Sequence, residues 1–171
     1  MPSTSGSTVL FMAFPSPDSS GLIAWAHFRD LVARGMSAAE QGESARERQL
    51  ERAWAAQHHL GIWRMLASNH REVARSAHAY PSFESARLAV TELQSTPASL
   101  EIRSFHGPSS STHGWAALSE GRPVFTCARW YETESASSEA GALSVAAFRS
   151  AAVADSPWQR AERARQARRA V

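Results

Sequence analysis

The chain has 171 residues, a formal net charge of +2, 43% hydrophobic residues and 20% charged residues. This composition is ordinary for a globular protein and excludes a chain that is disordered throughout. The single cysteine, Cys127, excludes an internal disulfide and a zinc site built from several cysteines. No apolar run approaches the roughly 20 residues that a membrane span needs. We therefore expect a cytoplasmic protein in a reducing environment, with no membrane contact.

Residues 1–59 are expected to form an N-terminal segment with one strand and one solvated helix. The stretch TVLFMAF at 8–14 is typical of a buried strand. Apolar residues of 22–36 recur at helical spacing, but LIAWAHF at 22–28 also fits a strand that pairs with 8–14, and we favour the strand. Residues 37–57 are rich in Ala, Glu, Gln and Arg, which predicts a mostly solvated helix.

Residues 63–80 and 115–131 share one pattern, and each copy is expected to form a strand, a turn and a second strand. With one gap opposite His70, six of the 17 aligned pairs are identical. The gap falls at a polar turn, where loop length varies most easily. The identical pairs are Trp63/Trp115, Leu66/Leu118, Arg71/Arg122, Val73/Val124, Ala77/Ala128 and Tyr80/Tyr131.

The segment after each copy predicts a helix. Residues 83–95 and 137–152 both place apolar side chains on one helical face. Ser82 and Ser137 are the expected N-caps, because serine is favoured at that position. Each copy therefore reads as two strands followed by a helix.

A further strand is expected before the second copy, since SLEIRSF at 99–105 alternates apolar and polar residues. The corresponding strand of the first copy is either 50–57, whose composition favours a helix, or the distant 8–14. The predicted fold class is α+β: two tandem ββ(β)α repeats with pseudo-two-fold symmetry, and an antiparallel sheet with both helices on one face. The expected divisions are a segment at 1–59, a domain at 60–153 with repeats at 60–96 and 99–153, and a tail at 154–171.

The first copy resembles the repeat of the YegP-like family, also called the UPF0339 or DUF1508 family. That repeat reads roughly W-R-L-x-A-x-N-G-x-x-V-A-x-S-x-x-x-Y-x-S before an Ala-rich helix. The resemblance covers about 60–153, is best over 62–95 and is weaker over 113–152, and Asn69-His70 stands where the family has Asn-Gly. It implies tandem ββ(β)α units and no chemistry, because the family has no established activity. The matching residues are Trp63, Arg64, Leu66, Ala67, Asn69, Val73, Ala74, Ser76, Tyr80, Ser82, Ala86, Val90 and Leu93.

Alternation along the strands predicts two apolar sheet faces. Trp63 and Leu66 are three residues apart, and Val73 and Tyr80 are seven apart, so the members of each pair are expected on opposite faces. The face without helices must be covered by the N-terminal 60 residues, by a second chain or by a ligand. The candidate interaction residues are Tyr80, Trp130 and Tyr131.

The sequence offers little that indicates catalysis. Cys127 lies mid-strand and is interpreted as a small buried hydrophobe, since a nucleophile would need a base that no motif supplies. None of the seven histidines has an acid or a cysteine at ligand spacing. The stretch GPSSSTHG at 107–114 lacks the lysine and the following helix of a phosphate loop. We therefore expect no catalytic residue, no metal and no cofactor.

The positive charge is concentrated in the tail. Residues 156–171 contain five arginines and one glutamate, a net charge of +4, whereas 1–155 contain 13 arginines and 15 acidic residues, a net charge of −2. Pro157 is typical of a first helical turn, so a basic helix is predicted. Such a helix either contacts phosphates or is a solubilising end. The candidate nucleic-acid-binding residues are Arg160, Arg163, Arg165, Arg168 and Arg169.

The sequence as a whole favours a small non-catalytic binding module whose partner is another protein or a second copy of the chain, reached through the sheet face. The alternative is an accessory protein that binds RNA or DNA through the tail. A second alternative is an enzyme that uses Cys127 with a distant histidine.

Overall fold

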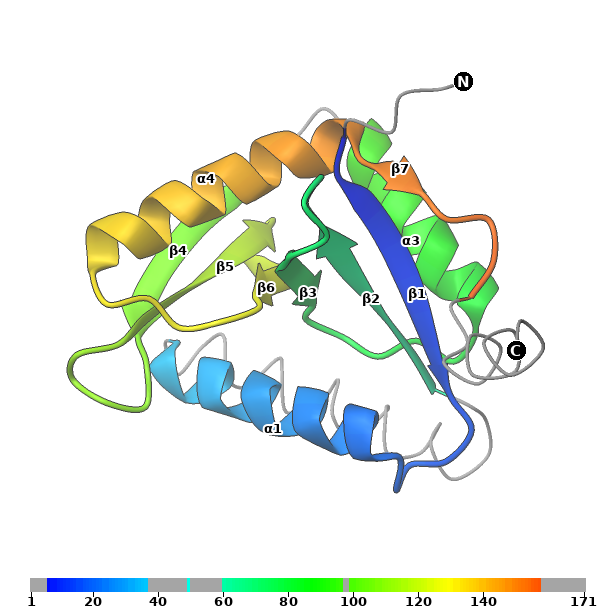
Figure 1. Ribbon diagram of the computed structural model, residues 1–171, viewed down its shortest axis with the longest axis horizontal. Coiled ribbons are helices and arrows are strands. Elements are labelled where there is room, and N and C mark those ends of the chain that lie inside the picture. The colour runs from blue at the N-terminus through cyan, green and yellow to red at the C-terminus, as the bar shows by residue number, and fades with distance from the viewer. Residues whose placement is uncertain (1–5, 37–48, 50–59, 97–98, 158–171) are drawn as a thin grey trace, which may run out of the picture.

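The computed structural model describes residues 6–36, 49, 60–96 and 99–157. Within these residues the fold is α+β, with seven strands in one sheet and three helices packed on it (Figure 1). Apart from Gln49, which is helical, the predicted helix at 37–57 lies outside the described residues, and so does the predicted basic helix of the tail beyond residue 157. The strands are β1 (Thr8–Phe14), β2 (Leu60–Leu66), β3 (Glu72–Ser76), β4 (Glu101–His106), β5 (His113–Ser119), β6 (Arg122–Cys127) and β7 (Ala152–Val153). The helices are α1 (Ser20–Gly35), α3 (Phe83–Ser95) and α4 (Glu134–Ser150).

The sheet has the strand order β4-β5-β6-β3-β2-β1-β7. Every neighbouring pair is antiparallel except β1 and β7, which are parallel. Strand β1 pairs with β2 along its whole length, from Thr8 opposite Leu66 to Phe14 opposite Leu60. Residues 8–14, one of the two alternatives for a strand beside the first copy, therefore form a strand that pairs with β2, and the other alternative, 50–57, lies outside the described residues.

Helices α3 and α4 cover one face of the sheet, and α1 lies across the other (Figure 1). Alternate residues of β5 show the division, because Trp115 and Ala117 join the core under α3 and α4, whereas Ala116 and Leu118 join a core under α1. Helices α3 and α4 thus share one face of the sheet, as expected for 83–95 and 137–152. The opposite face was expected to be covered by the N-terminal residues, a second chain or a ligand, and α1 shows that the N-terminal residues cover part of it.

The starts of α3 and α4 are each fixed by a hydroxyl side chain. Ser82 is the N-cap of α3, as expected. Its Oγ accepts a hydrogen bond from the backbone N–H of Ser85 at 3.1 Å, and Ser85 Oγ accepts one from the backbone N–H of Ser82 at 3.2 Å. Helix α4 begins three residues earlier than predicted, because Thr133 and not Ser137 is its N-cap. Thr133 accepts from Ala136 N–H at 3.1 Å, and Ser137 lies inside the helix, facing the core.

The strand favoured for 22–28 is wrong, since these residues belong to helix α1. Leu22, Trp25 and Val32 recur at helical spacing, and all three are buried against the sheet. The indole N–H of Trp25 also donates to the backbone oxygen of Ser76 at 3.0 Å, which fixes the helix over β3. A seven-residue apolar run is compatible with a strand or a helix, and here the burial of one helical face against the sheet favours the helix.

The expectation that Val73 and Tyr80 lie on opposite faces is also wrong. In the pairing of β2 with β3, Met65 is opposite Ala74 and Leu66 is opposite Glu72, so Val73 is an extra residue in a bulge. The bulge and the bend that follows β3 break the alternation, and both Val73 and Tyr80 pack against the core under α3 and α4. The second hairpin has a bulge at the aligned position, Val124.

Candidate anion-binding pocket

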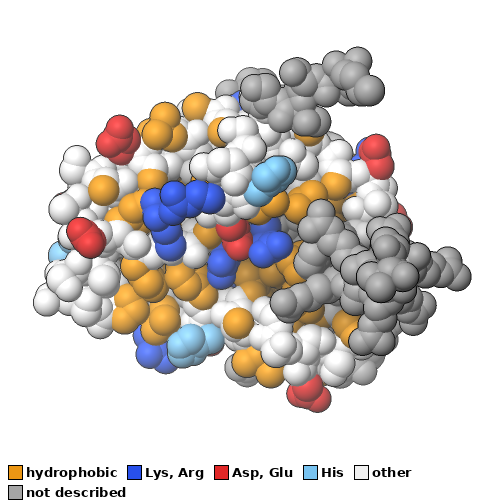
Figure 2. All heavy atoms as spheres, in the orientation of Figure 1, with side chains coloured by type: hydrophobic (Ala, Val, Ile, Leu, Met, Phe, Trp, Pro, Cys, Tyr) orange, Lys and Arg blue, Asp and Glu red, His pale blue; other side chains and the backbone are white. Residues whose placement is uncertain are grey.

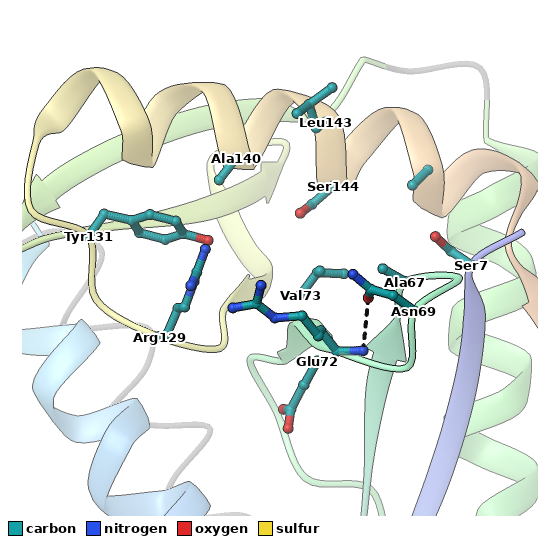
Figure 3. Close-up of a pocket in the computed structure, with 12 residues that line it drawn as sticks. Ser7, Ala67, Asn69, Glu72, Val73, Arg129, Tyr131, Ala140, Leu143 and Ser144 are labelled. Atoms are coloured by element: carbon teal, nitrogen blue, oxygen red, sulfur yellow. Dashed lines mark hydrogen bonds between the residues drawn. The ribbon is translucent and has the colours of Figure 1, made fainter.

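A pocket of about 290 Å³ lies between α4 and the turn that joins β2 to β3 (Figure 3). Short and apolar side chains of α4 form its roof, and Val73 lies on the opposite side. In Figure 3 Ser144 and Ala140 point from α4 into this space, and Tyr131 and Arg129 border it. The polar residues that line the pocket, apart from Glu72, are Ser7, Asn69, Arg71, Arg129, Tyr131 and Ser144.

The space exists because α4 packs with small residues. Of the α4 residues that line the pocket, Ala140, Ser144 and Ala147 have short side chains. Short side chains of this kind fill less of the volume between a helix and a sheet. The side chain of Leu143, 64% exposed, lies at the outer rim of the pocket.

The turn between β2 and β3 holds two of the polar residues in place. Ala67 N–H donates to Arg71 O, and His70 N–H donates to Ala67 O, both at 2.9 Å, which closes a three-residue loop. His70 has a φ of 62°, the left-handed conformation that such a loop requires. Asn69 Oδ1 accepts from the backbone N–H of Arg71 at 3.1 Å. The positions of Asn69 and Arg71 at the pocket are therefore determined by local hydrogen bonds.

The wall beside the turn comes from the residues that follow β6. Tyr131 exchanges two backbone hydrogen bonds of 2.8 Å with His113, which anchors it to the start of β5. The guanidinium of Arg129 lies 5.0 Å from the centre of the Tyr131 ring, a cation–π contact. The ring therefore orients an exposed arginine at the pocket.

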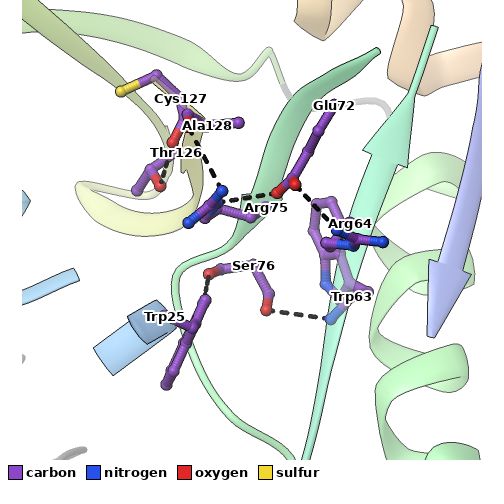
Figure 4. A network of polar contacts seen from close by, with 9 residues as sticks. All are labelled: Trp25, Trp63, Arg64, Glu72, Arg75, Ser76, Thr126, Cys127 and Ala128. Carbon is purple, nitrogen blue, oxygen red and sulfur yellow. Dashed lines mark hydrogen bonds and ion pairs between the residues drawn. The ribbon is translucent and has the colours of Figure 1, made fainter. Parts of the chain in front are cut away.

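Among the described residues that line the pocket, Glu72 is the one carboxylate, and it is already paired. Glu72 binds Arg64 at 3.1 Å and Arg75 at 2.9 Å through its two oxygens (Figure 4). Arg71 and Arg129, in contrast, form no ion pair with any residue that the structure describes. In Figure 2 basic side chains gather on this side of the molecule, between α4 and α1, around an acidic one.

The structure separates the three candidate interaction residues. Tyr80 follows β3 and Tyr131 follows β6, and these neighbouring strands are antiparallel, so the two tyrosines lie at opposite ends of the sheet. Trp130 packs under α1, with its ring centre 5.1 Å from that of Phe28 and 6.2 Å from that of Phe105. Of the three, Tyr131 lines the pocket. The five arginines predicted for nucleic-acid binding lie outside the described residues.

Cys127 is fully buried in the core under α3 and α4. Burial raises the pKa of its thiol from 9.0 to about 11, which disfavours the thiolate at neutral pH. Across the described ranges, no group of three or more His, Cys, Asp or Glu side chains is arranged to hold a metal ion. Over the same part of the chain, no helix has the length and apolar character needed to cross a membrane.

Two pocket residues, Arg71 and Arg129, were not identified as candidates from the sequence. Arg71 belongs to one of the identical pairs of the two copies, but its exposed position at a turn carries no chemical signal by itself. Arg129 follows β6, and its proximity to Arg71 depends on the pairing of β6 with β3. A pair of arginines 58 positions apart is visible only once that pairing is known.

No protein-family model matches the chain, and comparison with curated proteins and with solved structures finds no similar one. The resemblance of the first copy to the YegP-like repeat therefore stays a prediction.

Proposed function

We propose that this chain is a small non-catalytic binding module that holds an anionic group in the pocket between α4 and the β2–β3 turn. The observation that carries the proposal is that Arg71 and Arg129 line the same pocket without a carboxylate partner among the described residues. Guanidinium groups bind carboxylate and phosphate with paired, charge-assisted hydrogen bonds. A second molecule that brings an anion would supply the missing partner.

The lining supports a small amphipathic ligand. A volume of about 290 Å³ is at the lower end of the range for small-molecule sites. Arg71 and Arg129 are exposed, so the anionic end would lie near the mouth of the pocket. Ala140 and Ala147 offer an apolar surface further along α4, with the hydroxyl of Ser144 between them. A short-chain carboxylate or a phosphate monoester has this combination of features.

The state of Cys127 supports a non-catalytic role over the enzyme alternative. A thiol nucleophile works as the thiolate, is reached by substrate and has a base beside it. The thiol of Cys127 has no exposed surface, and its pKa of about 11 keeps it protonated. An enzyme that used this residue would have to open its core first.

A calorimetric titration tests the proposed function. Inorganic phosphate, short-chain carboxylates and phosphate monoesters are titrated into the full chain and into the double variant Arg71→Gln/Arg129→Gln. The matched control is Arg34→Gln, an exposed arginine of α1 that does not line the pocket. We expect the control to bind as the unchanged chain does and the double variant to bind roughly 100-fold more weakly. Equal affinities for the double variant and the control would refute the proposal.

Nucleic-acid binding through the tail is the second candidate function, and one sequence feature favours it. Residues 156–171 carry a net charge of +4 on a body of −2, and the body presents its own basic side chains between α1 and α4 (Figure 2). Lys and Arg contacts of this kind go to phosphates and are independent of base sequence.

We further infer that β1-β2-β3-α3 and β4-β5-β6-α4 are one unit used twice. The strand order supports this. From the central β3–β6 pair outward, each side of the sheet contains the third, the second and then the first strand of its unit. The bulges at Val73 and Val124 and the bridges of Tyr80 and Tyr131 also fall at aligned positions. The gap opposite His70 corresponds to a three-residue turn in one hairpin and a two-residue turn, 120–121, in the other. An experimental structure in which the two units do not superimpose by a two-fold rotation would refute the inference.

A further inference from the structure

Strand β4 is an edge strand. It pairs with β5 on one side, and no strand among the described residues pairs with its other side. The outer strand of the other half of the sheet, β1, does accept a neighbour there: Ala152 N–H donates to Ser7 O, and Ala154 N–H donates to Val9 O, both at 3.0 Å. An unpaired strand edge is a template for strand addition.

The backbone groups that β4 presents outward follow from the sheet register. The backbone N–H and C=O of His113 both bond to Tyr131, on the side of β5 away from β4. The N–H and C=O of the next residue, Gly114, therefore point toward β4, where Gly114 is paired with Phe105. Because directions alternate along a strand, Arg103 and Glu101 also bond inward to β5. The outward N–H and C=O groups therefore belong to Ile102, Ser104 and His106.

The side chains of β4 divide in the same alternating way. Ile102 packs against the core under α4, and Ser104 Oγ lies 2.7 Å from Ser138 Oγ of that helix. Glu101 and Arg103 lie on the opposite face of the sheet with Phe105, and they form an ion pair of 2.9 Å with each other. This edge of the described sheet therefore carries one acidic and one basic side chain, two residues apart on the same face.

We propose that β4 is the interface of a homodimer, in which β4 of a second copy adds antiparallel with its two-fold axis at Ile102. A symmetric antiparallel pair has its axis on a residue, and charge selects which one. An axis at Ile102 places Glu101 of each copy opposite Arg103 of the other. An axis at Arg103 places like charges together, and an axis at Ser104 pairs Arg103 with Phe105.

Helix α4 permits this approach. Gly141 crosses close above Ile102, since a Cβ added to it would lie 2.9 Å from Ile102 Cγ2. The helix flank next to Gly141 carries the small side chains of Ser138 and Ala142. Pairing of the two β4 strands brings the two α4 helices side by side, and small residues there allow helices to pack closely.

Charge exchange tests the register. The mass of the full chain is measured by analytical ultracentrifugation over a concentration series, and a dimer is expected. Glu101→Arg alone and Arg103→Glu alone each create two like-charge contacts and weaken the dimer on the order of tenfold. The double exchange Glu101→Arg/Arg103→Glu restores it, and Asp18→Arg, the same charge change away from the edge, leaves it unaffected. A monomer at all concentrations, or a dimer that is indifferent to the single exchanges, overturns the proposal.

Two further variants keep the test independent of side-chain charge. Ser104→Pro removes an outward N–H without removing a bond to β5, so it abolishes the dimer and leaves the fold intact. Residues 101 and 103 of the two copies form a non-hydrogen-bonded pair, whose Cα atoms lie about 4.5 Å apart. A mixture of Glu101→Cys and Arg103→Cys chains therefore forms an intermolecular disulfide that neither chain forms alone. A dimer that survives Ser104→Pro, or a mixture that does not cross-link, would place the interface elsewhere.

Discussion

The Nε of Arg75 lies 2.9 Å from Oε1 of Glu72, its neighbour on the same strand, β3. This contact matters for the pocket because the carboxylate of Glu72 also binds Arg64, so each of its two oxygens already has an arginine partner other than Arg71 or Arg129. The positive charge at the pocket is thus not neutralised from within the described part of the chain.

Glu72→Gln is expected to lower the free energy of unfolding by about 1–2 kcal/mol, since it breaks two part-buried, charge-assisted hydrogen bonds. It is also expected to strengthen anion binding, because it removes a negative charge that lines the pocket. Urea unfolding gives the first quantity and calorimetry the second. The control is Asp155→Asn, which breaks an exposed ion pair with Arg87 and should change neither. Weaker anion binding in Glu72→Gln would contradict the electrostatic account.

Ser144→Leu is expected to abolish anion binding while the chain stays folded. Ser144 points into the pocket, and three added carbons occupy the space that the ligand would fill (Figure 3). Both arginines remain in this variant, so it separates a pocket from a merely basic surface. Ser135→Leu, an exposed position of α4, is the control. Circular dichroism verifies the fold, and unchanged binding by Ser144→Leu would show that the anion binds outside the pocket.

The burial of Cys127 predicts a loss of stability at alkaline pH. The pKa of the thiol is about 11 in the folded chain against 9.0 for an exposed thiol, so between these values the unfolded state ionises and the folded state does not. The free energy of unfolding therefore falls as pH rises from about 9 to 11, by up to about 1.4 kcal/mol per pH unit. The chain has no lysine, so few other groups titrate in this range. Urea unfolding at several pH values should show a shallower fall for Cys127→Ala, and identical slopes would contradict the assignment.

Truncation to residues 1–155 tests the nucleic-acid alternative. If the tail neutralises about four phosphates, the full chain binds duplex DNA with a slope of log K against log salt of roughly −3 to −4. The truncated chain should lose this binding and keep the anion site. Fluorescence anisotropy with labelled DNA and RNA at several salt concentrations measures the slope. Equal binding by the truncated chain would assign the phosphate contacts to the body.

Local signals predicted much of the fold. A serine cap followed by an amphipathic stretch gave the bounds of α3, because capping and periodicity act within a few residues. The failures arose where distant residues decide: α1 became a helix because Trp25 reaches Ser76, 51 positions away. The bulge at Val73 reversed the expected face of the residues beyond it, and the cap of α4 lies at Thr133 because Ser137 faces the core.

The candidate pocket could not be predicted from the sequence for the same reason. Arg71 and Arg129 approach each other because β6 pairs with β3 as well as with β5. The space beside them depends on the short side chains that α4 presents there, those of Ala140, Ser144 and Ala147. Neither long-range pairing nor an unfilled volume leaves a periodic or spaced pattern along the chain.

A double-mutant cycle on Arg71 and Arg129 tests the central claim most directly. The affinity for the anion that binds tightest is measured by calorimetry for the unchanged chain, Arg71→Gln, Arg129→Gln and the double variant. If both guanidinium groups hold one anion, each single change raises the dissociation constant. The fold-increase for the double variant is then smaller than the product of the two single fold-increases, because the first loss already disrupts the shared contact. Single changes without effect, or fold-changes that multiply as for independent distant charges, would contradict a shared anion site.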